Sequence, residues 1–416
     1  MSMRVYLVGG AVRDRLLGLP VQERDWVVVG STPEEMLAQG YRQVGHDFPV
    51  YLHPQTGEEY ALARTEQKQG RGYKGFSVAF SPEVTLQEDL FRRDLSINAI
   101  AEDEQGELID PYGGLEDLRA RRLRHVSPAF VEDPLRVLRV ARFASRFASL
   151  GFTVTAATYA MMQTMATAGE LKDLTAERVW KETARSLMGE QPSVYFRVLR
   201  HVGAMQPWFT EIDHLFGVPQ NPQWHPEVDS GEHTLMALDQ AARGQASLAV
   251  RVATLLHDLG KAQTPQDQWP HHPDHGLRGL PPIKAFCQRL KVPREAQDLS
   301  LLVAAHHIQL HKIEQANAAE IMSLLKALDA LRRPQRMLDF IQACQFDIQG
   351  RLGHHMDTYP QGQLLRIATE VAQRADISQI LNRQLKGPEL SLQLDNTRIA
   401  ALSMWLEQLT GPTTDI

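Results

Sequence analysis

The sequence predicts an α+β protein in which a small mixed-sheet domain is followed by all-helical domains. Short apolar, β-branched runs alternate with glycine turns near the amino terminus, whereas from about Pro134 onward apolar residues recur with helical spacing. A chain of 416 residues is too long for one ordinary core. We therefore expect a head at 1–125, a helical neck and body at 126–220, a helical domain at 226–330 and a helical carboxyl-terminal region at 331–416.

The composition is that of an ordinary globular protein, with 43% hydrophobic and 23% charged residues. No apolar run approaches the roughly 18 residues of a membrane helix, and the amino terminus lacks a signal-peptide pattern. Cys287 and Cys344 are the two cysteines, so no disulfide framework is expected. These features favour a cytoplasmic protein without a membrane partner. The net charge of −6 argues against indiscriminate binding to nucleic acid but allows a local basic groove.

The head is expected to begin with a strand, a turn at Gly9-Gly10 and a short helix at Ala11–Leu17. Three apolar or β-branched runs are expected to be strands: Arg4–Val8, Trp26–Val29 and Glu59–Arg64. The basic, glycine-rich segment Gln67–Gly75 is expected to be a mobile loop. This order places a glycine turn and a pair of acids between the first two strands.

These turn and acidic residues suit nucleotide chemistry. Backbone amides at Gly10, before a helix, can approach phosphate oxygens closely, and Arg13 can add a charge-assisted contact. Glu23 and Asp25, two residues apart at a strand entrance, point the same way. They can hold two magnesium ions, one activating an attacking hydroxyl and one steadying a leaving pyrophosphate. A turn followed by two solvated acids is the alternative, but the joint order favours a metal-dependent nucleotidyltransferase site.

This layout resembles the superfamily of class II tRNA nucleotidyltransferases and bacterial poly(A) polymerases. The family usually carries Asp-x-Asp, whereas this chain has Glu23 at the first position, which predicts slower chemistry or a changed metal preference. Further matching motifs are Arg92–Ala99, Asp110–Leu118, Glu132–Arg136 and the helical pair Arg178 and Glu182. The resemblance implies that Arg93 helps to fix the ribose and phosphate. The pair at 178 and 182 is expected to form an i,i+4 ion pair within a helix.

A stripe of charged residues begins within the motif Glu132–Arg136. Asp133, Arg136, Arg139 and Arg142 are spaced by three and lie along one side of a helix. A carboxylate accepts from an exocyclic amine and an arginine donates to a ring nitrogen or carbonyl, which favours cytosine and adenine. The resemblance implies that Asp133 and Arg136 select the base without a nucleic-acid template. The alternative is a basic helix with an acidic cap, and Arg139 and Arg142 are expected to meet phosphates.

Histidines gather in the second half of the chain, where nine of the 16 fall between positions 225 and 311. A mid-helix His257-Asp258 pair, with histidines on other helices, can bind a divalent metal and position a water for attack on a phosphoester. The further histidines proposed as ligands are His233, His275 and His307. The string HDLGK resembles the HD metal-dependent phosphohydrolase domain, which implies magnesium, nickel, manganese or a similar ion.

The HD resemblance has a gap at its last ligand. HD domains generally close the metal site with an aspartate, and the expected place after His307 holds Ile308. No acidic residue occurs from Val303 to Lys312. Either His306 or His311 substitutes for it, or the hydrolase site is weakened or empty.

The two sets of motifs together resemble the gamma-proteobacterial family of multifunctional CCA-adding proteins, from residue 3 to about 312. The resemblance implies addition of C, C and A to the 3′ end of tRNA from CTP and ATP, with Mg²⁺ at Glu23 and Asp25. It implies secondary 2′-nucleotidase, 2′,3′-cyclic phosphodiesterase and phosphatase activities on the HD side. The residues implied to hold triphosphate and ribose are Gly10, Arg13, Arg93, Arg139 and Arg142. Folded RNA would meet the arginines of 119–146 through its backbone, and DNA is not an expected partner.

Three other interpretations compete with this one. The chain could be a poly(A)-adding or CC-adding relative, a metal phosphohydrolase whose head only binds RNA, or a tRNA-binding scaffold. The HD string disfavours a poly(A)-adding relative, and the intact loop at Gln67–Gly75 disfavours a CC-adding one. Two separate metal constellations disfavour the scaffold. Both a monomer and a homodimer are compatible with the sequence, and it assigns no role to residues 332–416.

Overall fold

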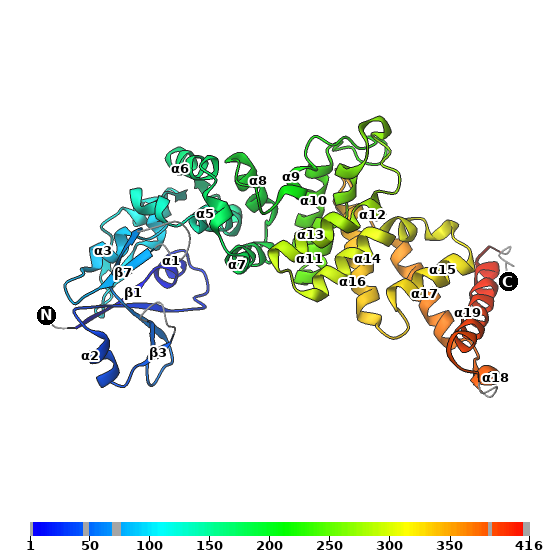
Figure 1. The fold of residues 1–416 in the computed structure, drawn as a ribbon, viewed down its shortest axis with the longest axis horizontal. Helices are drawn as coiled ribbons and strands as arrows, with labels where there is room; N and C mark the ends of the chain where they lie inside the picture. The colour runs from blue at the N-terminus through cyan, green and yellow to red at the C-terminus, as the bar shows by residue number, and fades with distance from the viewer. Residues whose placement is uncertain (1–2, 45–49, 69–75, 382–384, 411–416) are drawn as a thin grey trace. The chain divides into compact units, whose positions relative to one another are not determined.

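The computed structural model describes residues 3–44, 50–68, 76–381 and 385–410 (Figure 1). The chain divides into two compact units, Met1–Trp208 and Phe209–Ile416. The expected domain boundaries at 125, 220 and 330 remain predictions. Within the described residues, no helix combines the length and the apolar character that crossing a membrane requires.

The first unit begins with a seven-stranded mixed sheet in the order β3-β4-β5-β2-β1-β8-β9. Its strands are β1 (Arg4–Val8), β2 (Asp25–Val29), β3 (Arg42–Val44), β4 (Val50–Leu52), β5 (Glu59–Leu62), β8 (Ala101–Glu102) and β9 (Leu108–Ile109). The pair β2–β5 is parallel and the others are antiparallel, which confirms the expected mixed sheet. Because side chains alternate along a strand, Val27 and Val28 enter different apolar clusters, one on each face of β2.

Short helices lie between the strands. Helix α1 (Gly10–Leu16) follows β1, and α2 (Pro33–Ala38) follows β2 and begins with a capping box of Thr32 and Glu35. Strands β6 (Arg64–Lys68) and β7 (Phe76–Phe80) form a separate antiparallel pair. The expected loop at 67–75 is therefore strand at its first two residues, and its remainder, 69–75, lies outside the described residues.

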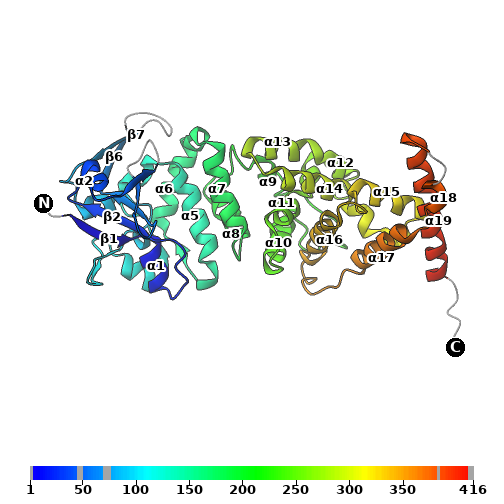
Figure 2. The same ribbon diagram turned by 90° about the horizontal axis from the view of Figure 1, so that it is seen from below.

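Helices form the rest of the first unit, as the sequence predicts. They are α3 (Leu86–Phe91), α4 (Gly114–Arg119), α5 (Leu135–Arg146), α6 (Ala156–Thr167), α7 (Ala176–Leu187) and α8 (Ser193–His201). Two short strands, β10 (Arg122–Leu123) and β11 (Thr153–Val154), pair in parallel beside them. Helix α5 packs against α7 and α8, so its arginines are held between the sheet-containing part and the helices (Figure 2).

The second unit is helical throughout its described residues. Its helices are α9 (Thr210–Asp213), α10 (Ser230–Arg243), α11 (Leu248–Leu256), α12 (His275–Arg278), α13 (Leu280–Leu290), α14 (Arg294–His311), α15 (Ala318–Leu328), α16 (Pro334–Gln349), α17 (Pro360–Arg374), α18 (Ser378–Leu381) and α19 (Gly387–Thr410). Side chains of Asp229 and Ser247 cap α10 and α11. Helices α10, α11, α14 and α16 contact one another and enclose a histidine cluster.

Candidate functional site

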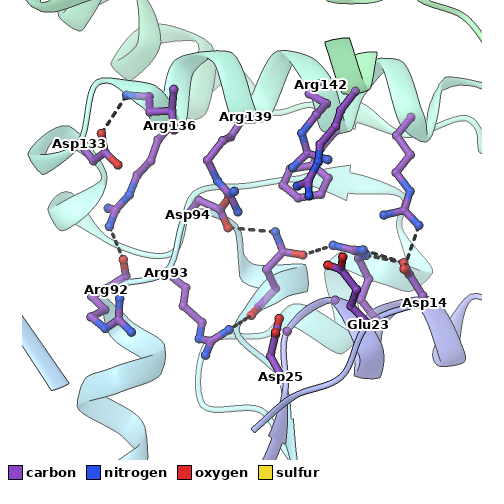
Figure 3. Close-up of a pocket in the computed structure, with 18 of the residues that line it drawn as sticks. Asp14, Glu23, Asp25, Arg92, Arg93, Asp94, Asp133, Arg136, Arg139 and Arg142 are labelled. Atoms are coloured by element: carbon purple, nitrogen blue, oxygen red, sulfur yellow. Dashed lines mark hydrogen bonds and ion pairs between the residues drawn. The ribbon is translucent and has the colours of Figure 1, made fainter. Parts of the chain in front are cut away.

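A cleft of ≈570 Å³ in the first unit collects the residues that the sequence nominated for nucleotide binding. Glycine and acidic residues come from the segments after β1 and before β2, and the arginines of α5 project toward them (Figure 3). The cleft is lined by Gly10, Arg13, Glu23, Asp25, Arg93, Asp133, Arg136, Arg139 and Arg142. We call it the arginine-rich cleft, because its lining contains more arginines than carboxylates.

The turn after β1 depends on Gly9. Its φ of 69° lies in the left-handed region, and a Cβ at this position would lie 2.8 Å from Arg93 Nη1. Its amide donates to the Ile100 carbonyl (3.1 Å), so Gly9 shapes the turn while Gly10 begins α1. The first backbone N–H groups of α1 have no carbonyl acceptor within the helix, so they can donate to an anion in the cleft.

Glu23 and Asp25 reach the cleft from the entrance of β2 (Figure 3). The pKa of Asp25 is raised because the surrounding protein desolvates its carboxylate and Glu23 adds a second negative charge. Arg93 and Arg139 offset part of this effect. Two solvent-accessible carboxylates that repel each other provide the oxygen donors that Mg²⁺ prefers. The donor set therefore fits a magnesium ion whose coordination shell is completed by nucleotide phosphates.

Asp94 anchors the floor of the cleft. Its Oδ2 accepts from Arg139 Nε at 2.7 Å, and its Oδ1 accepts from Asn98 Nδ2 at 2.9 Å. Asn98 in turn accepts from Arg13, so one chain of hydrogen bonds joins α1 to α5. Burial opposes ionisation of Asp94, yet the Arg139 guanidinium holds its pKa well below the ordinary value. Both arginines thus reach the cleft in fixed orientations.

The motif pair on α7 has partners on other elements. Arg178 Nη2 lies 2.7 Å from Asp133 Oδ2, while Glu182 accepts from Arg142 and lies 3.7 Å from Arg139 Nη1. The prediction of an ion pair within the helix missed these contacts, because it considered spacing along α7 alone. In the fold, the two α7 side chains form ion pairs with the charged residues of 133–142 and fix their positions.

The two expected base-selecting groups are held by the protein itself. Asp133 binds Arg178 and also accepts from the Leu135 amide at 3.0 Å. The Arg136 guanidinium donates to the backbone carbonyls of Ala129 and Arg92. Both groups are therefore fixed beside the cleft, and base selection by them remains a prediction.

The second unit contains a buried cluster of ligands from five elements. We call it the histidine–aspartate centre, and its members are His233, His257, Asp258, His275, His307 and Asp347. His257 follows the last residue of α11, and Asp258 starts the next 3₁₀ turn, Leu259–Gln263. The expected mid-helix position of this pair is therefore wrong: it lies where α11 ends, and a break in the helix lets both side chains face inward.

Asp347 on α16 supplies the carboxylate that the sequence was expected to lack. Its Oδ1 lies 3.1 Å from His233 Nε2 and 3.7 Å from His257 Nε2. Ile308 is 39% exposed and lies outside the centre, and the partly buried His306 pairs with Gln309. Asp347 therefore takes the closing position for which the sequence offered a substitute histidine or no ligand, because the aspartate comes from a later helix.

His311 supports this carboxylate. Its Nε2 lies 2.7 Å from Asp347 Oδ2, and its Nδ1 lies 2.8 Å from the Tyr359 hydroxyl. An imidazole fixed on both nitrogens orients the carboxylate that it contacts. His311 is thus a positioning residue, a role different from the substitute ligand expected from the sequence.

Asp258 joins two ligand groups through its two oxygens. Oδ2 lies 3.2 Å from His257 Nε2, whereas Oδ1 lies 3.4 Å from His275 Nε2 and 3.8 Å from His307 Nε2. Close backbone packing at Gly260 makes this possible, since a Cβ there would lie 1.7 Å from the His275 carbonyl oxygen. Two neighbouring groups of ligands therefore share one carboxylate.

Burial and charge in the centre favour a bound cation. Among the described residues, His257 Nε2 and both Asp258 oxygens are shielded from solvent and make no hydrogen bond of ordinary geometry with another ligand of the centre, while Lys261 Nζ forms an ion pair with Asp258 Oδ2 at 2.5 Å. Burial opposes protonation of His257, but Asp258 and Asp347 raise its pKa to about 10. A mixed imidazole and carboxylate donor set suits Mn²⁺, Ni²⁺ or Zn²⁺ better than Mg²⁺. The residues therefore fit a divalent transition metal.

Sequence reasoning missed Asp347 because it follows the matched HD residues by 40 positions or more. One signal was present. Phe340, Cys344 and Asp347 share a buried face of α16, so a charged residue interrupts an otherwise apolar stripe. A buried carboxylate needs a partner, and such an interruption points to an ion or a ligand.

Comparisons with known proteins agree with the geometry. The family model of the poly(A) polymerase head domain matches residues 5–124, a model described as a probable RNA- and SrmB-binding site of polymerase A matches 151–216, and the HD domain model matches 231–331. A multifunctional CCA protein of Pseudomonas fluorescens is 56% identical over 406 residues, which cover 98% of this chain and 99% of that protein.

Solved structures share the fold at lower identity. An apo form of a CCA-adding enzyme aligns over 99% of this chain and 89% of its own, with a TM-score of 0.65 and 21% identity. The Thermotoga maritima CCA-adding enzyme complexed with tRNA aligns over 100% of this chain and 89% of its own, with a TM-score of 0.60 and 20% identity. At this identity the likeness establishes the fold.

Proposed function

The chain belongs to the family of the multifunctional CCA proteins, and on this premise we propose how its two sites divide the chemistry. It is a CCA-adding tRNA nucleotidyltransferase that carries an HD phosphohydrolase domain. The arginine-rich cleft performs nucleotide addition, and the histidine–aspartate centre hydrolyses phosphoesters. The observation that carries the first assignment is the meeting of nine nominated residues in one cleft.

In the cleft, Glu23 and Asp25 would hold magnesium, which would supply charge neutralisation at the reacting phosphates. The Gly10 amide and Arg13 bind triphosphate oxygens, and Arg139 and Arg142 face the same anion from α5. The tRNA 3′-hydroxyl attacks the α-phosphate, and pyrophosphate leaves. Guanidinium groups in fixed orientations lower the free energy needed to bring the negative charges of the nucleotide and the tRNA end together.

Base selection belongs to Asp133 and Arg136 in this proposal. Selection between CTP and ATP without a nucleic-acid template needs hydrogen-bond donors and acceptors that keep their orientation. Arg178 fixes Asp133, and two backbone carbonyls fix Arg136. Related structures were solved with tRNA and with ATP, which supports tRNA and nucleotide as partners of this chain.

In the histidine–aspartate centre, His233, His257, Asp258 and Asp347 would hold one divalent metal. His275 and His307 would hold a second with the other oxygen of Asp258. Bound metal supplies an activated water and neutralises phosphate charge. The substrates proposed are 2′-phosphates and 2′,3′-cyclic phosphates of nucleotides or RNA ends.

The transferase assignment is tested with purified protein and tRNA that lacks its terminal CCA. With CTP and ATP together, three nucleotides should be added in the order C, C, A, and CTP alone should stop after two. Long A tails on any RNA would instead identify a poly(A)-adding relative, and two cytidines without a final A would identify a CC-adding relative.

The phosphohydrolase assignment is tested with the metal-stripped full chain after reloading with Mg²⁺, Mn²⁺ or Ni²⁺. Hydrolysis of a 2′,3′-cyclic nucleotide should return with Mn²⁺ or Ni²⁺ more than with Mg²⁺. His257→Ala should abolish this hydrolysis and leave CCA addition unchanged. Absence of hydrolysis with every metal would refute the assignment.

A further inference from the structure

Arg351 stands beside the histidine–aspartate centre without an acidic partner. Its guanidinium Nε is shielded from solvent and makes no hydrogen bond within the described residues, and the side chain forms no ion pair with any of them. A shielded N–H donor without a partner is unfavourable, and a bound anion would satisfy it. This residue plays no part in the sites described so far.

The backbone places Arg351 one helical turn beyond the metal ligand Asp347. Helix α16 ends at Gln349, but the turn continues, since the Gly350 amide donates to the Phe346 carbonyl (2.8 Å) and the Arg351 amide to the Ile348 carbonyl (3.2 Å). Residues four apart in a helical turn lie on the same side. Arg351 therefore extends the face of α16 that carries Asp347.

A second contact holds this segment against the centre. The Leu352 amide donates to Glu227 Oε2 at 3.1 Å, and Glu227 Oε1 lies 2.9 Å from His233 Nδ1. The residue next to Arg351 is thus joined through one carboxylate to a metal ligand. The position of Arg351 beside the centre is fixed from both α16 and the loop before α10.

The residues around Arg351 are less buried than the ligands on α10 and α16. His311, Tyr359 and Arg351 are partly exposed, whereas His233 and Asp347 are buried. Burial raises the pKa of Tyr359 well above its ordinary value, and the Arg351 cation is among the charges close enough to oppose this. Tyr359 contacts His311, and His311 contacts Asp347, so the Arg351 charge acts at this edge of the centre.

We propose that Arg351 binds the phosphate group of the substrate at the histidine–aspartate centre. This inference rests on the proposed phosphohydrolase function and adds a substrate-binding residue to it. The lysine of the HDLGK string is already neutralised, since Lys261 Nζ lies 2.5 Å from Asp258 Oδ2. A phosphomonoester dianion that approaches two buried aspartates needs another cation, and the planar guanidinium can bind two phosphate oxygens at once.

Substitution of Arg351 by glutamine tests the proposal in the metal-loaded full chain. Loss of a charge-assisted contact should weaken inorganic phosphate binding, measured by calorimetry, by roughly tenfold or more. The KM for a 2′,3′-cyclic nucleotide should rise by a similar factor. Bound metal and CCA addition should stay unchanged. Arg366→Gln, on the exposed face of α17, is the matched control and should change neither value.

Chemical rescue separates a binding role from a structural one. Free guanidinium should restore phosphate affinity to Arg351→Ala, and Arg351→Lys should retain part of it. Unchanged phosphate affinity in Arg351→Gln would overturn the proposal, as would loss of bound metal in that variant or failure of the wild-type protein to bind phosphate. If the wild type binds phosphate through Arg351 but hydrolyses no phosphoester, the phosphohydrolase function fails and this inference stands.

Discussion

The arginine-rich cleft and the histidine–aspartate centre both contain carboxylates suited to metal, but their surroundings are opposite. In the cleft, Glu23 and Asp25 are accessible and face guanidinium groups. In the centre, Asp258 and Asp347 are buried among imidazoles, and ligand atoms lack ordinary hydrogen bonds. In the proposed function, the cleft would therefore receive its metal together with a large anionic substrate, whereas the centre would keep its metal between reactions.

The largest expected effect comes from Asp25→Asn. Loss of this ligand should slow CCA addition by roughly 10³-fold, because magnesium contributes several kcal/mol of charge stabilisation. Hydrolysis of a 2′,3′-cyclic nucleotide should stay at the wild-type rate. Assays of both activities on one preparation test this, and equal loss of both would show that the two sites are not independent.

Asp347→Asn is the reciprocal change. Removal of a buried ligand should lower divalent metal content and reduce phosphoester hydrolysis by roughly 10²-fold, with CCA addition unchanged. Metal analysis and the two assays provide the readout. Full metal content with full hydrolysis would mean that Asp347 does not close the centre.

Asp94→Asn tests how much the ion pair between Asp94 and Arg139 contributes to the stability of the folded protein. Removal of the buried partner of Arg139 should reduce the free energy of unfolding by about 3 kcal/mol. Because the folded pKa of Asp94 lies below the unfolded value of 3.8, this stabilisation is present above that value and is lost as pH falls through the folded pKa. Urea unfolding should show that wild type and variant converge in acid, and a pH-independent difference would contradict the ion pair.

Glu23→Asp should have a small effect. The shorter side chain moves the carboxylate by about one carbon–carbon bond, and nucleotide phosphates complete the metal shell, so CCA addition should change by less than about tenfold. Glu23→Ala serves as the comparison and should lose far more. Unchanged CCA addition in Glu23→Ala would remove Glu23 from the metal site.

Ile308→Asp should have the smallest effect. This residue is 39% exposed and lies outside the centre, so hydrolysis should change by less than about twofold. A large gain of hydrolysis would show that an aspartate is missing after His307, as the sequence suggested. Parallel measurement of metal content identifies the cause of any change.

The two regions also differ in how far sequence could predict them. The cleft was predicted residue by residue, because its groups lie in short motifs on turns and one helix. Its internal connections were missed, since the contacts of Arg178 and Glu182 join α7 to other segments. Pair spacing along one helix does not reveal a partner on another.

The histidine–aspartate centre was predicted only in part. The five nominated ligands were His233, His257, Asp258, His275 and His307, and the structure brings them together with Asp347, which was missed. The last ligand depends on how α16 packs against α11 and α14, which is a long-range property of the bundle. The mixed sheet and the helical second half followed from local patterning, because strand and helix periodicities are readable without tertiary contacts.

The most direct test of two separate metal sites is an anomalous diffraction map of full-length crystals grown with Mn²⁺ and a non-hydrolysable CTP analogue. We expect one set of peaks against Glu23 and Asp25 with the triphosphate, and another within contact of His233, His257, Asp258 and Asp347. Omission of the nucleotide should remove or weaken the first set and leave the second. A map in which Asp347 contacts no metal, or in which the first set persists equally without nucleotide, would contradict this account.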